Sequence, residues 1–416
     1  MRIKAVTTAV VQANFDYTYV RIETDDGLMG VGEAFMAPGL PATIRELGAV
    51  IIGADPRNVA PLVDRLMLAV SGSGGASGAG MAYNAVSGIE AALWDLAGRA
   101  LGLPVWQLLG GRYRDSVEVY ADLHAGGELE SLDRVMRYRT PFWRSASGRT
   151  EPGAFFWEAA EGNAVSADAA IARGREAVAA GFRYIKFDVD VFAQTREASS
   201  RSMGRADIER IGQLAGRIRE ALGDDIEIAY DCHWRFDVPS AIAIAHAIAP
   251  SRPLWLEDPV PPDPLTLSRL ATSSPVPIAT GENTYLVEGF EALASHGAAD
   301  ILTPDVQKAG GILETVRIAD LAARRFLPIA PHCIASPVGF MAAVHACAAA
   351  SNVLCLEFHG SDVPFWNRLV TATTPLIAGG RVGVPTTPGL GVDLDMAVVR
   401  EYAAPGEPVF DEAPAR

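Results

Sequence analysis

The sequence predicts an α/β fold in which a parallel barrel of alternating strands and helices is joined to a smaller α+β domain. Polar residues recur roughly every 25 residues along the second half of the chain, which is the length of one strand-helix unit of such a barrel. Each of them closes a short apolar or β-branched run and precedes a helix-like segment. The six are Asp231, Glu257, Glu282, Asp305, His332 and Glu357. The chain has 416 residues and one barrel takes about 250, so a second domain is expected.

The α+β domain is expected over residues 1–115. The stretch from Met1 to Ala34 has two β-rich segments and then an Asp-Asp-Gly turn, which is typical of antiparallel strands. A helix is predicted in SGIEAALWDLAGRALG, which begins with Ser87, has apolar residues at helical spacing and carries glycines near its end. Residues 366–416 are rich in Gly, Pro and Thr, and we expect them to fold back onto this first domain.

The barrel is expected over residues 116–365. Its first three strands are predicted at Val117 to Leu123, Tyr184 to Val189 and Glu227 to Cys232. Strands four to eight are predicted to end near Glu257, Thr280, Thr303, Ala330 and Phe358. Because the carboxyl ends of all strands meet at one face of a barrel, the polar residues that close them should share one mouth.

A long insertion, residues 124–165, separates the first predicted strand from its helix. Connections of this kind usually take 2 to 6 residues, and those that follow barrel strands emerge at the catalytic face. The insertion carries arginines among aromatic residues: Arg134, Arg137, Arg139, Phe142, Trp143, Arg144, Arg149, Phe155, Phe156 and Trp157. A substrate-recognition lid and a subunit contact both fit this composition.

The composition argues against several classes of partner. The formal net charge of −15 disfavours nucleic acid, because binding to nucleic acid depends on Lys and Arg neutralising phosphates. The N-terminus does not resemble a signal peptide, so a cytoplasmic location is expected. The uncharged stretch from Phe326 to Glu357 contains several prolines, which suits a buried strand and helix better than a membrane span. The four cysteines have no paired spacing and are expected to be reduced thiols.

Three of the strand-end acids fit a divalent metal site. Asp231, Glu257 and Glu282 close the third, fourth and fifth predicted strands. Neighbouring strands present such carboxylates at a spacing that one cation can bridge, and Mg²⁺ prefers a few oxygen ligands together with water or substrate oxygens. Solvated strand ends are the alternative for any one of these acids alone, but three in succession favour a metal site.

Asp305 and His332 close the next two predicted strands, so the carboxylate can orient one ring nitrogen and leave the other to take a proton. This arrangement favours a catalytic base over a structural histidine. His246, His296 and His345 fall in helical segments and are expected to be structural. His124 and His359 lie near strand ends and stay ambiguous.

Lys186 and Asp188 share one face of the second predicted strand, and His233 follows Asp231 by the same interval. Lys186 can neutralise a substrate carboxylate or an enolate, and His233 can give a proton to a leaving group. Asp188 receives no definite role. A surface ion pair between Lys186 and Asp188 is the alternative.

At this point the chain resembles the enolase superfamily and, within it, the mandelate racemase subgroup. The motifs that carry the resemblance span nearly the whole chain: DDGLMGVGEA, GIEAALWDLAG, KFD, DCHWRF, WLEDP, ATGEN, DVQKAGG, PHC and LEFH. The resemblance implies a capping domain, formed by the N-terminal region and the C-terminal segment, over a modified TIM barrel. It also implies Mg²⁺ held by Asp231, Glu257 and Glu282, a general base made of His332 and Asp305, and Glu357 hydrogen-bonded to an enolised carboxylate. Members act on small carboxylic acids and are often homo-oligomers.

One departure from the subgroup bears on the reaction. Many racemases and some dehydratases place a second lysine where this chain has Asp188, whereas His233 resembles the general acid of some acid-sugar dehydratases. We therefore expect dehydration of an aldonate or aldarate to a 2-keto-3-deoxy acid. A racemase, epimerase or cycloisomerase that uses the same enediolate is the alternative, and a non-catalytic binding protein is a third. The loops near Phe15 to Tyr17 and Ala37 to Leu40 are expected to read the substrate.

Overall fold

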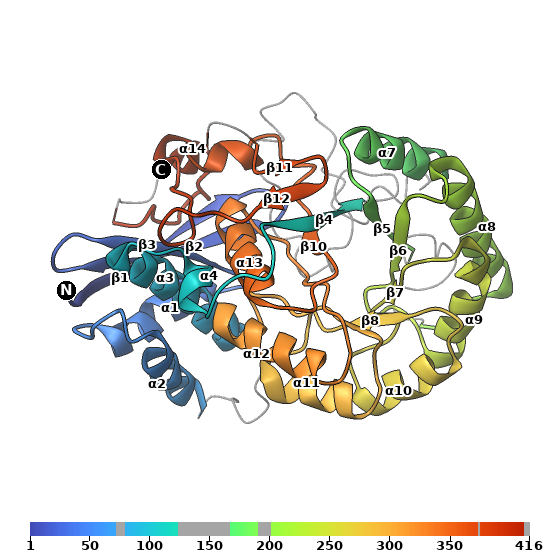
Figure 1. Ribbon diagram of the computed structural model, residues 1–416, viewed down its shortest axis with the longest axis horizontal. Coiled ribbons are helices and arrows are strands. Elements are labelled where there is room, and N and C mark those ends of the chain that lie inside the picture. Colours follow the sequence, from blue (N-terminus) through green and yellow to red (C-terminus); the bar gives the residue numbers. More distant parts are fainter. Residues whose placement is uncertain (72–79, 124–166, 190–200, 373–374, 412–416) are drawn as a thin grey trace.

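The computed structural model of the protein describes residues 1–71, 80–123, 167–189, 201–372 and 375–411 (Figure 1). It contains a capping domain and a barrel that share a broad interface. The helices that follow the barrel strands form an arc around the strands, and the blue N-terminal and red C-terminal parts of the chain lie together at the other side. The predicted insertion, 124–165, lies outside the described residues.

The capping domain begins with an antiparallel sheet in the order β1 (Ile3–Gln12), β2 (Asp16–Thr24) and β3 (Met29–Ala34). In the described part of this domain, the sheet is followed by α1 (Leu40–Gly48), α2 (Val59–Ser71), α3 (Met81–Leu101) and α4 (Val105–Leu108). The sheet packs closely on α3, because a Cβ on Gly32 would lie 2.4 Å from the carbonyl oxygen of Gly88. Glycine at this strand position therefore permits the approach of strand to helix.

The barrel strands are parallel and neighbour one another in sequence order: β4 (Ser116–Leu123), β5 (Tyr184–Asp188), β6 (Glu227–Asp231), β7 (Leu256–Glu257), β8 (Ile278–Thr280) and β9 (Ile301–Leu302). The last strand, β10 (Leu356–Phe358), pairs with β4 and closes the barrel. Between β9 and β10 the ladder is reduced to single bridges from Ile329 to Leu302 and Val353. Pro328 and Pro331 flank this position and have no backbone N–H to donate, so the seventh predicted strand is not a regular strand.

The described residues between and after these strands form the helices α7 (Ala167–Ala179), α8 (Arg205–Leu222), α9 (Val238–Ile248), α10 (Pro264–Ser273), α11 (Leu286–Ser295), α12 (Ile312–Ala323) and α13 (Pro337–Ala349). Every residue of α13 is buried, because this helix lies between the capping sheet and the barrel. Its all-round apolar surface explains the long uncharged stretch of the sequence. Among the residues described, none of the helices combines the length and apolar character needed to cross a membrane.

The C-terminal segment contacts both domains. The hairpin of β11 (Ile377–Ala378) and β12 (Arg381–Gly383) adds to the barrel, because β12 pairs antiparallel with β4. After α14 (Met396–Glu401), single bridges join Ala403 to Val11 and Val409 to Ala9 on β1. The return to the first domain begins before α14, where Gly389 is bridged to Pro104 and the backbone N–H of Leu390 donates to Oδ1 of Asp95 at 2.8 Å, and it continues beyond α14. The domain limits near residues 115 and 365 stay predictions.

Candidate active site

Three buried carboxylates gather at the C-terminal ends of β6, β7 and β8. Asp231 and Glu257 are the last residues of their strands, and Glu282 lies two residues beyond β8. Each can offer one oxygen such that the three oxygens lie within 4.8 Å of one another. Among the described residues, Oε1 of Glu257 has no hydrogen-bond partner. Carboxylates buried in this way need a compensating positive charge, and their oxygens suit a divalent cation.

Lys186 on β5 lies beside these acids and is only 2% exposed. Its Nζ lies 2.8 Å from Oδ2 of Asp231, 2.8 Å from Oε1 of Glu357 and 3.4 Å from Oε2 of Glu257. Burial alone would lower the pKa of Lys186, but the surrounding carboxylates raise this pKa well above its usual value, so the ammonium is charged. Because Lys186 and Asp188 are both buried, the alternative of a surface pair is wrong.

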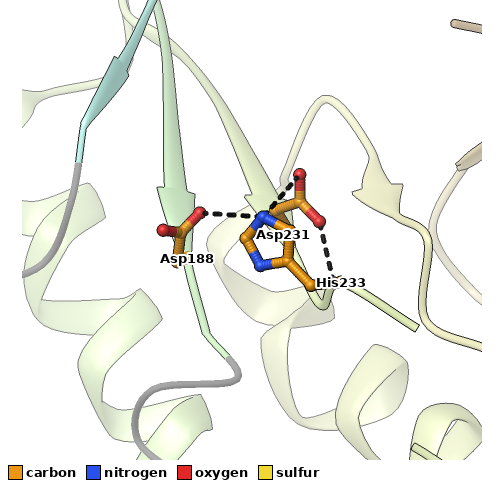
Figure 2. A group of neighbouring side chains, drawn as sticks. All are labelled: Asp188, Asp231 and His233. Carbon is orange, nitrogen blue, oxygen red and sulfur yellow. Dashed lines mark hydrogen bonds and ion pairs between the residues drawn. The ribbon is translucent and has the colours of Figure 1, made fainter. Parts of the chain in front are cut away.

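Asp188 lies beside His233 (Figure 2). Nε2 of His233 lies 4.0 Å from Oδ1 of Asp188 and 3.8 Å from Oδ2 of Asp231. The His233 backbone, with a φ of 44°, turns sharply after β6, and its N–H donates to Oδ1 of Asp231 at 3.0 Å. Asp188, Asp231 and His233 also satisfy the spacing of a metal site. The two possible sites share Asp231, and the all-carboxylate group is the better match for a hard cation such as Mg²⁺.

His332 and Asp305 come together as the sequence predicts. Nδ1 of His332 lies 2.7 Å from Oδ2 of Asp305, and Nε2 lies 3.4 Å from Oε2 of Glu282 and 3.8 Å from Oε2 of Glu357. Burial lowers the pKa of His332, but the nearby Glu282, Glu357 and Asp305 carboxylates outweigh burial and raise it to about 9. One ring nitrogen is thus held by a carboxylate while the other faces the three-acid group.

A second histidine-carboxylate pair lies between β10 and β4. Nε2 of His359 lies 3.5 Å from Oδ2 of Asp122, and Nδ1 lies 2.9 Å from Nδ2 of Asn14 in the capping domain. Oδ2 of Asp122 is 3.9 Å from Nζ of Lys186, so this pair lies next to the group of acids around Lys186. From the sequence, His359 was ambiguous and Asp122 was not predicted. A charged residue inside the apolar strand VEVYADL was the available signal.

Two phenylalanine rings of the capping domain contact the histidines of these two pairs, one ring to each histidine. The Phe15 ring lies 5.3 Å from His359, the Phe35 ring lies 6.2 Å from His332, and the two phenylalanine rings are 6.4 Å apart. Nζ of Lys308 lies 3.8 Å from the centre of the Phe35 ring. The capping domain thus contacts the barrel strand ends through these two rings. Phe15, which the sequence placed in a substrate-reading loop, lies beside His359.

Comparison with known proteins identifies the family. Residues 3–110 match the mandelate racemase / muconate lactonizing enzyme N-terminal domain, and residues 169–398 match the enolase C-terminal domain-like family. The chain belongs to the enolase superfamily, in its mandelate racemase / muconate lactonizing enzyme branch. The barrel strand ends and the capping domain described above are therefore the two parts of an enolase-type enzyme.

Individual members of the family cover the full length of the chain. D-xylonate dehydratase from Haloferax volcanii is 36% identical over 99% of this chain and 91% of its own length. D-galactonate dehydratase from Ralstonia pickettii is 29% identical over 96% of this chain and 94% of its own length. The crystal structure of a mandelate racemase/muconate lactonizing enzyme-like protein from Rubrobacter xylanophilus superposes with a TM-score of 0.87 at 36% identity, covering 98% of this chain and 99% of that one.

Proposed function

We propose that the protein is a Mg²⁺-dependent dehydratase that converts an aldonate or aldarate into a 2-keto-3-deoxy acid. The observation that carries this proposal is the His332-Asp305 pair. Nδ1 of His332 contacts Asp305, and Nε2 faces the three buried carboxylates at the C-terminal ends of the barrel strands. The similarity to D-xylonate and D-galactonate dehydratases supports a sugar acid as the substrate.

Asp231, Glu257 and Glu282 are the residues that would hold the cation. The fit rests on the oxygen-only donor set and on Oε1 of Glu257, a buried oxygen that has no hydrogen-bond partner in the described part of the chain. When bound there, a divalent cation supplies positive charge that stabilises the negative charge developing on the substrate carboxylate.

Proton removal from C2 is assigned to His332. Asp305 holds Nδ1 at 2.7 Å and orients the ring. A cation held by the three acids would offset the carboxylates that raise the pKa of His332, which leaves Nε2 able to take the proton. Lys186 carries a positive charge beside Glu357. This charge neutralises the substrate carboxylate as the enediolate forms. Glu357 is held in place by the backbone N–H of Cys333, which donates to Oε2 at 2.8 Å.

Loss of water from C3 is assigned to His233. Protonated at Nε2, this ring gives its proton to the departing hydroxyl, the C3–O bond breaks, and the electron pair of the enediolate forms the C2–C3 double bond. The resulting enol takes up a proton at C3, loses the proton of its C2 hydroxyl and becomes the 2-keto acid. Asp188, within 4.0 Å of Nε2, favours the protonated imidazole.

Asp188 also bears on the choice between dehydration and racemisation. A racemase needs a base on each face of C2, and a carboxylate that is 0% exposed and paired with His233 replaces the second lysine found in related racemases. One-sided proton removal followed by elimination is the chemistry that this arrangement supports.

The test is a screen of the Mg²⁺-loaded protein against four- to six-carbon aldonates and aldarates, with 2-keto acid detected as the semicarbazone. We expect one acid or a few stereochemically related acids to react, and the His332→Asn variant to be inactive. Full activity in His332→Asn would contradict the assignment of the base. Deuterium uptake at C2 from heavy water without keto acid would point to a racemase, epimerase or cycloisomerase instead.

A further inference from the structure

The two residues of the His332-Asp305 pair stand on loops rather than on regular strands. Asp305 lies three residues beyond β9, a strand of two residues, and His332 follows the single bridge at Ile329. Strand register therefore contributes little to the position of either side chain. Their positions depend on how the two loops are fixed before the chain enters α12 and α13.

Glu33, near the end of β3 in the capping domain, binds the start of α13. Its Oε1 accepts from the backbone N–H of Ser336 at 3.0 Å, and its Oε2 accepts from the N–H of Gly339 at 2.9 Å and from the Ser336 hydroxyl. The carboxylate is 2% exposed and sits at the positive end of the helix dipole. Ser336 is only four residues beyond His332, so this contact fixes the end of the His332 loop.

The same carboxylate reaches the other loop through Gln307. The Gln307 side chain lies beside Glu33, whose pKa it lowers, and the Gln307 backbone N–H donates to Oδ1 of Asp305 at 2.6 Å. Packing at this point is tight. A Cβ on Gly339 would lie 2.8 Å from Nε2 of Gln307 and 3.0 Å from Oε2 of Glu33. Glu33 thus joins the loop that carries Asp305 to the loop that carries His332.

We propose that Glu33 is a positioning residue for the reaction, through which the capping domain sets the distance between His332 and Asp305. The proposal rests on the proposed role of that pair as the general base. It assigns the capping domain a part in proton removal, in addition to its aromatic contacts with His359 and His332.

Glu90 on α3 provides a matched control. It is 1% exposed, comes from the same domain and binds the start of α12, where its oxygens accept from the N–H groups of Ile312 at 2.8 Å and Leu313 at 2.9 Å. Glu33 and Glu90 therefore both join the two domains at a helix N-terminus. Glu90 binds seven residues beyond Asp305, whereas Glu33 lies beside the side chain of Gln307, the residue that holds Asp305 in place.

The experiment compares Glu33→Gln with Glu90→Gln in the full-length, Mg²⁺-loaded protein. Glutamine keeps the size of the side chain but points an N–H group at an N–H group, so both variants should unfold at lower temperature. Glu33→Gln should also lower kcat by about 10- to 100-fold while KM stays within about twofold, as expected for a residue that orients a catalytic group. With substrate deuterated at C2, its isotope effect on kcat should rise, because proton removal becomes the slow step. Glu90→Gln should keep the wild-type kcat and isotope effect.

A second readout does not require turnover. The ring N–H that His332 shares with Asp305 gives a downfield proton resonance, which is identified by its loss in His332→Asn. We expect this resonance to move or broaden in Glu33→Gln and to stay in place in Glu90→Gln. If the substrate screen finds no reaction, this measurement still tests the role of Glu33 separately from the proposed function.

Equal kcat values and unchanged ring resonances in both variants would overturn the proposal and leave Glu33 as a structural contact only. If Glu33→Gln does not fold, Gln307→Ala takes its place, because it breaks the link to the Asp305 loop and keeps Glu33 on α13. A wild-type kcat and ring resonance in Gln307→Ala would overturn the proposal in the same way.

Discussion

Among the described residues at the barrel strand ends, two buried histidine-carboxylate pairs differ in what the second ring nitrogen faces. In the His332-Asp305 pair the contact is 2.7 Å, and the remaining nitrogen faces the proposed metal ligands. In the His359-Asp122 pair the contact is 3.5 Å, and the remaining nitrogen lies 2.9 Å from the amide of Asn14. A carboxylate beside a histidine is therefore not enough to identify a base. The surroundings of the other nitrogen decide whether it can reach a substrate proton.

The largest expected effect separates the two pairs by mutation. His332→Asn should lower kcat by about 10²- to 10⁴-fold, because proton removal loses its base. His359→Asn should lower it by less than about tenfold, because this ring is assigned no proton transfer in the reaction. Steady-state rates and deuterium uptake at C2 measure both variants. An equal loss of kcat in both variants would contradict the assignment of His332 rather than His359 as the base.

The next effect concerns the proposed metal ligands, which the His332-Asp305 pair faces and the His359-Asp122 pair does not. Glu257→Gln should weaken Mg²⁺ binding by about 100-fold, because a charged ligand becomes neutral. In thermal unfolding, Mg²⁺ at 100 times its Kd should stabilise the wild-type protein by about 2.7 kcal/mol and the variant far less. His359→Asn serves as the control and should keep the full Mg²⁺ response. A variant that still responds fully to Mg²⁺ would argue against Glu257 as a ligand.

The scaffold behind the His332-Asp305 pair should give a pH-dependent stability. Burial raises the pKa of Glu33 and of Glu90 from 4.5 to about 7, and the hydrogen bonds that each accepts only partly offset burial. Between pH 4.5 and about 7, these two carboxyl groups keep their protons in the folded protein, whereas they have lost them in the unfolded chain. The contribution of each group to stability is thus full below pH 4.5 and is lost as the pH rises through about 7.

Each of these two groups should lower the free energy of unfolding by about 1.4 kcal/mol per pH unit within that window. Denaturant unfolding of the wild type and of the Glu33→Gln/Glu90→Gln protein, from pH 5 to pH 8, measures the difference. As the pH rises, the free energy of unfolding of the wild type should fall relative to that of the variant. A gap that is constant with pH would show that neither carboxyl titrates in this range.

The smallest expected effect concerns the His359-Asp122 pair alone. Asn14→Ala removes the amide that contacts Nδ1 of His359 and accepts from the Tyr17 hydroxyl at 2.9 Å. The turn that carries Phe15 should loosen, which we expect to raise KM by less than about tenfold and to leave kcat unchanged. Steady-state kinetics on the acid found in the screen provide the test. A loss in kcat as large as that of His332→Asn would mean that the second pair takes part in proton transfer.

The sequence predicted those parts of the site that depend on a repeated local pattern. Asp231 and Glu257 end their strands as expected, because an apolar run followed by an acid can be recognised without knowing the rest of the fold. The contacts between Asn14 and His359 and between Glu33 and Ser336 join residues about 300 or more positions apart. No local pattern records such contacts, since they arise when the capping domain packs on the barrel. The seventh strand was overpredicted because the prolines around Ile329 do not interrupt a hydrophobic pattern. They do remove backbone N–H donors from the hydrogen-bonded ladder.

The pairing of β1 with the residues beyond α14 has a consequence for synthesis of the enzyme. Gln12, two residues before Asn14, donates its backbone N–H to the carbonyl of Tyr402 at 2.9 Å, and Ala9 is bridged to Val409. Domains fold on the ribosome in the order in which they emerge, so β1 can pair here only after residues 402–409 have been made. Completion of this edge of the first sheet is therefore a late step in folding, although its strands come first in the sequence.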